Sequence, residues 1–381
     1  MRFLLAFDKF KDALPAPEAC AVAAQALGPG QATELCPLTD GGEGFCSILT
    51  RVVGGELVTC TVTGPLGAPV SAHYGRVDVA QLPAAIRTRL GLEAGARRLA
   101  IVEMAQASGL ALVPAGRRDP WQTTSRGTGE LIAAAADAGA DAILLGVGGS
   151  ATHDAGLGAL TALGLECRTT DGARLDPPVP QTWAALAAVA GQLRPLPPLF
   201  VACDVTNPLM GTFGAASVYA PQKGLQPEDF TRLEYMTGRM AALLCTHAKK
   251  HPLLCETPGA GAAGGLAFGL LAAADATLVP GFELVAEWLD LDAKLAACDV
   301  VLTGEGRFDA SSLQGKGPGA VVRRALDLGK PVHVFAGAVD LPEPVAALRK
   351  HALSPSGLPL AEALAATRAH LAAAVRAEFG P

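Results

Sequence analysis

The sequence repeats one arrangement, in which a short aliphatic run is followed at once by a segment of charged or polar side chains, with glycine in three of five cases. The five such segments are Asp8–Lys11, Thr39–Gly44, Gly148–Asp154, Asp204–Pro208 and Gly304–Asp309. Lysine and arginine can neutralise a phosphoryl group in transfer, carboxylates can hold Mg²⁺ and accept a hydroxyl proton, and backbone amides can bind phosphate oxygens. The residue types therefore suit phosphoryl transfer, although any one segment alone would be explained as an ordinary turn or helix cap.

Strands and helices that alternate along the chain would bring these segments together. Short aliphatic runs predict strands at 2–7, 34–38, 98–104, 142–147, 198–203, 299–303 and 331–336, and helical spacing predicts helices at 16–27, 127–138, 228–249, 316–328 and 360–378. This alternation is typical of an α/β protein with mainly parallel strands. Open α/β sheets bind ligands at the carboxyl ends of their strands, where the five segments would lie.

The pattern of predicted strands and helices changes along the chain and indicates where domains meet. Residues 56–62 and 70–76 predict an antiparallel hairpin around Thr63–Gly67, and strand–helix alternation returns after about residue 290. Since 381 residues exceed what one core usually organises, we expect about two domains. The predicted limits are a discontinuous α/β domain of residues 1–56 and 290–381 and an inserted α/β domain of residues 57–289.

Composition excludes several functional classes. Charged residues make up only 17% of the chain and the net charge is −6 without a block of like charges, so a nucleic-acid partner is not expected. The longest uncharged stretch, Thr257–Ala274, is rich in glycine and alanine, which argues against a membrane span. No export signal is visible, and the nine scattered cysteines lack the spacing of a disulfide framework or a zinc site. We expect a cytoplasmic protein whose seven histidines lie mostly on the surface.

Familiar nucleotide and nucleophile motifs are absent. Gly315-Lys316 is followed by Gly317 and so does not complete a P-loop, and neither a protein-kinase catalytic loop nor a Gly-x-Ser-x-Gly elbow occurs. Gly259–Gly264 satisfies Gly-x-Gly-x-x-Gly, but Pro258 and the poor strand pattern before it do not match the dinucleotide-binding context. A nicotinamide-dependent hydroxy-acid oxidoreductase therefore stays only as an alternative.

The segments taken together resemble the type I glycerate kinases. The matching segments, in the family's order, are Asp8–Lys11, Asp40–Gly44, Thr63–Gly67, Glu103–Leu110, Thr124–Glu130, Gly148–Thr152 with Asp154, Ala202–Pro208, Pro221–Gly224, Pro258–Gly265 and Thr303–Asp309 with Gly315-Lys316. The chain departs from the family's usual residues at Phe7, Lys9, His153 and Gly317. Residues 81–95 look like a peripheral insertion that forms an amphipathic helix.

The resemblance implies an enzyme that transfers the γ-phosphoryl group of ATP, with Mg²⁺, to D-glycerate and gives 2-phosphoglycerate; 3-phosphoglycerate is the alternative product. It also implies two domains, one discontinuous and flavodoxin- or Rossmann-like, with the active site in the cleft between them. A homo-oligomer is compatible with the sequence. A non-catalytic sugar-acid sensor that keeps the same cleft is a second alternative.

Roles can be assigned to the residues of the matching segments. The candidate catalytic residues are Lys11, Asp204 and Arg307, with Asp204 as the base on the substrate hydroxyl and the two cations for phosphoryl charge. The candidate substrate-binding residues are Asp8, Arg126, Ser150, Asp154 and Asn207, of which Asp154 and Asn207 could instead be cap and turn residues. The candidate nucleotide-binding residues are Gly41, Gly42, Gly148, Gly149, Gly261, Gly264, Gly265 and Lys316. The candidate metal ligands are Asp40, Glu305 and Asp309.

Overall fold

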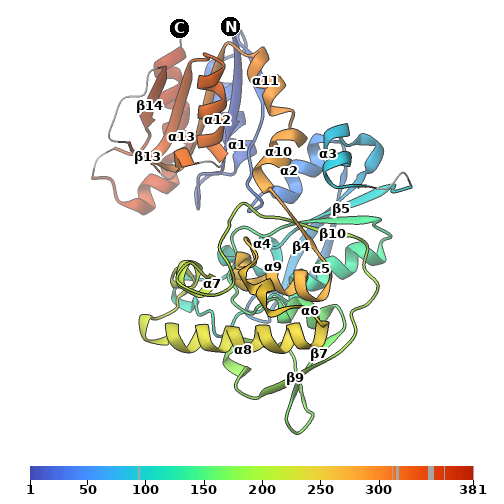
Figure 1. Ribbon diagram of the computed structural model, residues 1–381. Helices are drawn as coiled ribbons and strands as arrows, with labels where there is room; N and C mark the ends of the chain where they lie inside the picture. Colours follow the sequence, from blue (N-terminus) through green and yellow to red (C-terminus); the bar gives the residue numbers. More distant parts are fainter. Residues whose placement is uncertain (93–94, 311, 315–316, 342–346, 356, 381) are drawn as a thin grey trace. The chain divides into compact units, whose positions relative to one another are not determined.

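The protein is described by a computed structural model in which residues 1–92, 95–310, 312–314, 317–341, 347–355 and 357–380 are placed. Contacts divide the chain into two compact units, Met1–Asp40 with Phe282–Pro381, and Gly41–Gly281. We call them the first and the second unit and describe each by itself (Figure 1). The domain limits near residues 56 and 290, which come from the change in sequence pattern, stay a prediction.

The first unit is built on a five-stranded sheet in the order β2–β1–β12–β13–β14, with all neighbours parallel. The strands are β1 (Arg2–Phe7), β2 (Ala32–Leu35), β12 (Val300–Asp309), β13 (Val332–Asp340) and β14 (Leu348–Ala352). The helices are α1 (Ala16–Leu27), α10 (Gly281–Trp288), α11 (Leu291–Ala297), α12 (Gly317–Asp327) and α13 (Leu360–Phe379). Numbered along this unit alone, the strands follow the order 2-1-3-4-5, one of the two common orders of doubly wound sheets.

Strand β1 shows why a strand of this sheet can be predicted from the sequence. Phe3 to Phe7 are at most 1% exposed, so both faces of the strand are covered and the strand has a continuous apolar sequence. On one face, Phe3 and Phe7 join a core that includes Ala19 and Ala23 of α1 and Leu371 of α13.

The second unit contains a six-stranded sheet in the order β11–β10–β6–β5–β4–β3. Its strands are β3 (Glu56–Thr63), β4 (Pro69–Asp78), β5 (Arg98–Glu103), β6 (Ala142–Gly146), β10 (Leu199–Ala202) and β11 (Thr277–Val279). Strands β5, β6, β10 and β11 are parallel, whereas β4 is antiparallel to β3 and β5, as the predicted hairpin requires. A separate antiparallel sheet consists of β7 (Leu165–Thr169), β8 (Arg174–Leu175) and β9 (Leu186–Gly191).

The largest apolar core of the second unit includes the fully buried Trp183 and Phe268. The helices of this unit are α2 (Phe45–Val52), α3 (Ala84–Arg89), α4 (Ala105–Ser108), α5 (Arg126–Asp137), α6 (Leu157–Ala162), α7 (Ala215–Tyr219), α8 (Phe230–Ala248) and α9 (Ala262–Ala273). The long helix α8 appears in yellow in Figure 1. Short 3-10 helices are Val79–Gln81, Leu110–Leu112, Ala115–Arg117, Pro180–Thr182, Pro221–Lys223, Pro227–Asp229, Pro252–Glu256 and Ser312–Gln314.

A mixed α/β fold with several sheets is thus confirmed, with two local corrections. Gly304–Asp309, predicted as a loop, continues strand β12, because β13 runs on beside it as far as the pair Asp309–Asp340. A Cβ on Gly304 would lie 1.8 Å from the carbonyl oxygen of Phe335, so this glycine permits close strand contact and does not end the strand. In the predicted 81–95 helix, only Ala84–Arg89 is α-helical among the described residues, and residues 93–94 lie outside them.

Among the described helices, none combines the length and the apolar composition needed to cross a membrane. Of the seven histidines, His153 and His333 are buried, His251 is exposed and the other four are partly exposed.

Candidate active site

In the first unit, the segment that follows β1 lies beside strand β12, and the segment that follows β2 lies beside the end of β1. The Asp8 amide donates to the Gly304 carbonyl oxygen at 3.0 Å, and the Leu38 amide donates to the Phe7 carbonyl oxygen at 2.8 Å. These bonds extend the parallel pairing beyond the ends of the strands and hold Asp8 next to residues 304–305. We call this the carboxyl edge of the first unit.

Four acidic side chains influence one another at this edge. Burial, and after it the nearby carboxylates of Asp8, Asp309 and Asp40, raise the pKa of Glu305 to about 7, although a hydrogen bond with Ser312 acts in the opposite direction. The buried Oε1 atom of Glu305 has no hydrogen-bond partner among the described residues. A cation at this edge would relieve both the repulsion and the unsatisfied oxygen.

Part of that positive charge comes from Lys9, one of the residues at which the chain departs from the family pattern. Its Nζ atom lies 4.0 Å from Asp8 Oδ1 and 3.9 Å from Asp40 Oδ1. Lys9 is therefore an ion-pair partner of two of the four acids. Among the described residues, the group of three whose potential ligand atoms lie within 4.8 Å of one another does not include the predicted metal ligands Asp40, Glu305 and Asp309.

The predicted phosphoryl-binding cations are on the surface of the first unit. Lys11 is exposed, and Arg307 keeps 65% of its side chain exposed although it pairs with Asp309 at 3.3 Å and Asp340 at 3.0 Å. Neither is locked in the interior, so both side chains can turn toward a ligand. Lys316 lies outside the described residues. Gly317, where the family usually has a larger residue, has φ +48° and opens helix α12 next to Asp8.

In the second unit, the parallel strands β5, β6 and β10 bring their carboxyl ends to one edge. The Gly148 amide donates to the Gly41 carbonyl oxygen at 2.9 Å, and the Leu110 amide donates to the Gly149 carbonyl oxygen at 2.8 Å. A Cβ on Gly41 would lie 3.2 Å from the Ala202 carbonyl oxygen. The structure therefore gathers the predicted segments 41–44, 148–150 and 203–207, with the half-buried Asp204, at the carboxyl edge of this unit.

A buried lysine completes this edge and has no role in the sequence-based prediction. Lys223, only 1% exposed, donates from Nζ to Ser150 Oγ at 2.7 Å and to the Thr152 carbonyl oxygen at 2.6 Å. Burial lowers the pKa of Lys223 to about 7, although the nearby Asp154 carboxylate favours the charged form. Lys223 thus fixes Ser150 and sits close to the change between its charged and neutral forms at neutral pH. The signal available in the sequence was its place in the segment Pro221–Gly224, which resembles the family's.

Asp154 is fully buried and its oxygens accept bonds from the protein itself. Oδ2 accepts from the amide and hydroxyl of Ser125 at 2.7 and 2.8 Å and from the Gly158 amide at 3.3 Å, and Oδ1 accepts from the Gly156 amide at 3.1 Å. Burial raises the pKa of Asp154, and these bonds favour the carboxylate. Its position is that of a residue that holds the segment before α5 against the start of α6.

His153 is also buried, and its contacts fix its tautomer. Thr237 Oγ1 donates to the Leu233 carbonyl oxygen at 2.8 Å, so His153 Nε2, 3.0 Å from that hydroxyl, must be the donor between them. Burial, reinforced by Lys223, lowers the pKa of His153 to about 3, which keeps the ring neutral. The buried Nδ1 is then an acceptor without a hydrogen-bond partner among the described residues.

Comparison with known proteins gives this arrangement a family. The model of the glycerate kinase family matches residues 3–377. A glycerate kinase of Haemophilus influenzae is 38% identical over 349 residues, which cover 89% of this chain and 86% of that protein. Glycerate 2-kinase of Escherichia coli K12 is 36% identical over 365 residues, with coverage of 93% and 89%.

A solved structure is similar as well. It is the crystal structure of a Salmonella typhimurium LT2 protein provisionally named glycerate kinase 2, with a TM-score of 0.73, 36% identity and coverage of 100% of this chain and 96% of that one. The chain belongs to the glycerate kinase family. The predicted family and the predicted class, a kinase that phosphorylates an alcohol group, are confirmed.

In this glycerate kinase family member, two predicted substrate-binding residues have partners within the protein. Arg126 pairs through Nε with Glu130 at 2.9 Å and through Nη1 with Asp176, so a substrate carboxylate would have to replace one of these acids. Asn207 donates to the Phe213 carbonyl oxygen at 2.8 Å and accepts from the Tyr219 hydroxyl at 2.5 Å, which ties the segment after β10 to helix α7.

The glycines of the 259–265 segment have close neighbours in the protein backbone. A Cβ on Gly264 would lie 2.1 Å from the Thr152 carbonyl oxygen, and one on Gly261 would lie 2.3 Å from the Pro208 carbonyl oxygen. Gly265 has φ +86°, and a Cβ on it would lie 2.9 Å from the backbone Cα of Ala155. Packing alone therefore requires glycine at these positions. A 3-10 helix, Pro252–Glu256, precedes the segment where a dinucleotide-binding motif would have a strand.

Proposed function

We propose that this glycerate kinase family member uses ATP to phosphorylate D-glycerate at its 2-hydroxyl, which gives 2-phosphoglycerate. The observation that carries the proposal is the family match over residues 3–377, in which the segments after β1, β6 and β10 lie at the carboxyl edges of two sheets. Glycerate 2-kinase of Escherichia coli, a relative over 93% of the chain, supports the 2-position. The strand order of the first unit supports the flavodoxin-like assignment of that domain.

The acids at the carboxyl edge of the first unit fit a magnesium ion. Mg²⁺ prefers oxygen ligands, and it commonly takes only one or two protein carboxylates while water and substrate phosphates fill its other positions. Glu305, with its unpartnered buried oxygen, and the neighbouring Asp40 and Asp309 are the residues that would hold it. When bound, the ion would neutralise charge on the ATP phosphates.

The side chains of the chain itself supply positioning and charge. We assign Lys11 and Arg307 to the phosphoryl oxygens, because both are cationic and exposed at the segments that follow β1 and continue β12. Asp204 is the proposed base that accepts the proton of the substrate hydroxyl. Asp8 and Ser150 are proposed substrate-binding residues, with Lys223 orienting the Ser150 hydroxyl.

The other predicted residues are assigned roles in binding the glycerate carboxylate, in positioning and in nucleotide contacts through the backbone. Arg126, or in its place Arg307, is proposed to bind the glycerate carboxylate, since a planar guanidinium can donate two hydrogen bonds to it. Asn207 and Asp154 are proposed to position the segments that carry Asp204 and Ser150. Gly41, Gly42, Gly148 and Gly149 are proposed to present backbone amides to the nucleotide, whereas Gly261, Gly264 and Gly265 shape the adjoining segment.

Phosphorus NMR of the product tests the reaction. Incubation with ATP, Mg²⁺ and D-glycerate should convert ATP to ADP and yield a phosphomonoester on the secondary carbon. Formation of 3-phosphoglycerate would refute the 2-position, and tight glycerate binding without ATP turnover would favour a sensor. A nicotinamide absorbance change with glycerate in the absence of ATP would favour the oxidoreductase.

Replacement of Asp204 tests the base. Asp204→Asn should lower kcat by at least about 100-fold, because general-base catalysis contributes roughly 10²–10⁴-fold. The matched control is Asp327→Asn, which removes an exposed carboxylate at the end of α12 and should keep kcat near wild type. If Asp204→Asn keeps the wild-type kcat, Asp204 is not the base.

A further inference from the structure

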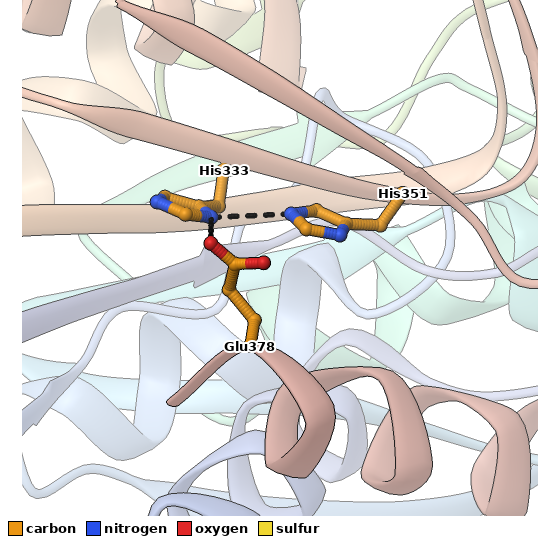
Figure 2. A group of neighbouring side chains, drawn as sticks. All are labelled: His333, His351 and Glu378. Carbon is orange, nitrogen blue, oxygen red and sulfur yellow. Dashed lines mark hydrogen bonds and ion pairs between the residues drawn. The ribbon is translucent and has the colours of Figure 1, made fainter. Parts of the chain in front are cut away.

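Two histidines and a glutamate of the first unit converge away from the carboxyl edge. His333 lies near the start of β13, His351 lies in the edge strand β14, and Glu378 lies in the last turn of α13 (Figure 2). In the parallel register, His351 pairs with Phe335, two residues beyond His333, so both histidines lie on the same face of the sheet. Helix α13 packs on β13 and brings Glu378 to that face.

The separations of the three polar atoms suit one small cation. His333 Nδ1 shares a hydrogen bond with His351 Nε2 at 3.1 Å and lies 3.7 Å from Glu378 Oε1, and one potential ligand atom from each residue lies within 4.8 Å of the others. A metal ion would replace that hydrogen bond, with its proton on the other nitrogen of the same ring. A tetrahedral zinc ion with bonds of about 2.0–2.1 Å keeps its ligand atoms about 3.4 Å apart. The two measured separations lie on either side of that value, so small side-chain shifts would admit an ion.

The surroundings keep both imidazoles available as ligands. His333 is 5% exposed, and burial lowers its pKa to about 4 and also lowers the pKa of His351. Both rings are therefore neutral near pH 7, the form that binds metals. Phe335 stacks on His351 with ring centroids 4.3 Å apart, and Phe379 packs against His333 at 4.6 Å, so the rings are held in place.

The carboxylate is oriented by a neighbour. Arg349 Nη1 donates to Glu378 Oε1 at 2.7 Å, and the Arg349 side chain is 70% exposed, so much of its charge is screened by water. An outer hydrogen bond of this kind to a ligating carboxylate is a common feature of protein metal sites. Arg349 can thus hold Glu378 toward the histidines without occupying the space between them.

We propose that His333, His351 and Glu378 form a site for one divalent transition-metal ion, best suited to Zn²⁺, with two imidazole nitrogens, one carboxylate oxygen and a water as ligands. Two nitrogens and one oxygen select zinc-class ions over Mg²⁺, which prefers oxygen ligands. The site differs in its residues from the acids proposed for magnesium. It would link the last turn of α13 to strands β13 and β14, so its role is to stabilise the first unit.

Metal-free protein, prepared with a chelator and kept reduced, should be titrated with Zn²⁺ by calorimetry while thermal unfolding is followed in parallel. The expected result is one tight site per chain and a higher Tm in the presence of zinc. His351→Asn and Glu378→Gln each remove a half-buried ligand and should weaken zinc binding by more than about tenfold, since loss of a mere outer-shell partner costs roughly 10–100-fold. His247→Asn, on α8, is the matched control and should leave the affinity unchanged.

The nine free cysteines are competing zinc ligands, and Co²⁺ distinguishes them. A site of nitrogen and oxygen ligands gives only visible ligand-field bands, whereas thiolate ligation adds an intense near-ultraviolet charge-transfer band. A weak visible spectrum that disappears in His351→Asn would support the proposal. Absence of zinc binding, an affinity unchanged in both ligand variants, or a thiolate band that persists in His351→Asn would overturn it.

Discussion

Replacement of Lys223 by methionine tests the buried lysine of the second unit through stability. Methionine keeps the length and apolar stem of the side chain but removes the ammonium group and its bonds to Ser150 Oγ and the Thr152 carbonyl oxygen. Because burial lowers the folded pKa of Lys223 to about 7, well below the usual lysine value of 10.5, the unfolded chain holds an extra proton between those two pH values. Stability from this group therefore rises with pH across that window.

The size of the effect follows from the linkage relation. One proton of difference changes the free energy of unfolding by about 1.4 kcal/mol per pH unit, so from pH 7 to pH 9 Lys223 should add about 2 kcal/mol. Buried thiols with raised pKa values, such as that of Cys20, act in the opposite direction at higher pH. They are present in both proteins, so the difference between wild type and Lys223→Met isolates the lysine.

Urea unfolding of the two proteins at several pH values between 7 and 9 is the assay. The wild type should gain about 2 kcal/mol on the variant over that range. The matched control is Lys330→Met, because Lys330 also donates to two backbone carbonyl oxygens, of Ala296 and Cys298, but is only half-buried. A stability difference between wild type and Lys223→Met that does not change with pH would refute the assignment of a lowered pKa.

Enzyme kinetics of the same variant distinguish a role of Lys223 in orienting Ser150 from a role in stability alone. If Lys223 orients Ser150 toward the substrate, Lys223→Met should raise KM for glycerate or lower kcat at a temperature where the variant is fully folded. Lys330→Met should change neither. A folded Lys223→Met enzyme with wild-type kcat and KM would restrict Lys223 to a structural part.

Two further substitutions test packing in the second unit. Burial raises the pKa of Glu103 to about 7, so its own contribution to stability should fall by about 3 kcal/mol from pH 4.5 to pH 7. Buried histidines titrate in both proteins, so urea unfolding should show this fall as a change with pH in the difference between wild type and Glu103→Gln. Gly75→Ala would place a Cβ 1.8 Å from Thr50 Oγ1 and should cost about 1–3 kcal/mol, lowering Tm. Thr50→Ala combined with Gly75→Ala should recover part of that loss, and no recovery would show that the clash is with something else.

The sequence predicted those elements whose buried residues are consecutive and therefore form a short apolar stretch. Strands β1, β5 and β6 are buried on both faces over most of their length, so their residues form short, mostly apolar runs, and α1 has a proline in its first turn, where a helix accepts it. Asp8 directly follows such a strand, whereas Asp40 comes after β2, which is largely exposed and ends at Leu35. Both acids follow predicted strands, and the structure places them near Glu305.

Elements whose stability depends on a distant partner were missed or shortened. Strand β14, Leu348–Ala352, contains arginine, lysine and histidine and is an edge strand, so neither alternation nor apolarity marks it. Strand β12 contains Gly304 and Gly306, which read locally as a loop, and only pairing with β13 extends it to Asp309. His333 and His351 meet only through the pairing of β13 with β14, which no motif spacing reveals.

Lys223 shows most clearly why sorting residues by the strand they follow finds only part of a site. Pro221–Lys223 forms a 3-10 turn after helix α7, and its local sequence resembles many exposed turns. What buries the lysine is its reach to Ser150 and Thr152, which lie more than seventy positions earlier in the chain. A lysine is almost never fully buried without partners that compensate its charge, and here two oxygens accept from it while the Asp154 carboxylate favours its charged form. Ser150 was predicted from its place after β6. Lys223, which orients the Ser150 hydroxyl, comes from a different part of the chain. A search for polar residues that follow strands therefore finds Ser150 but not Lys223.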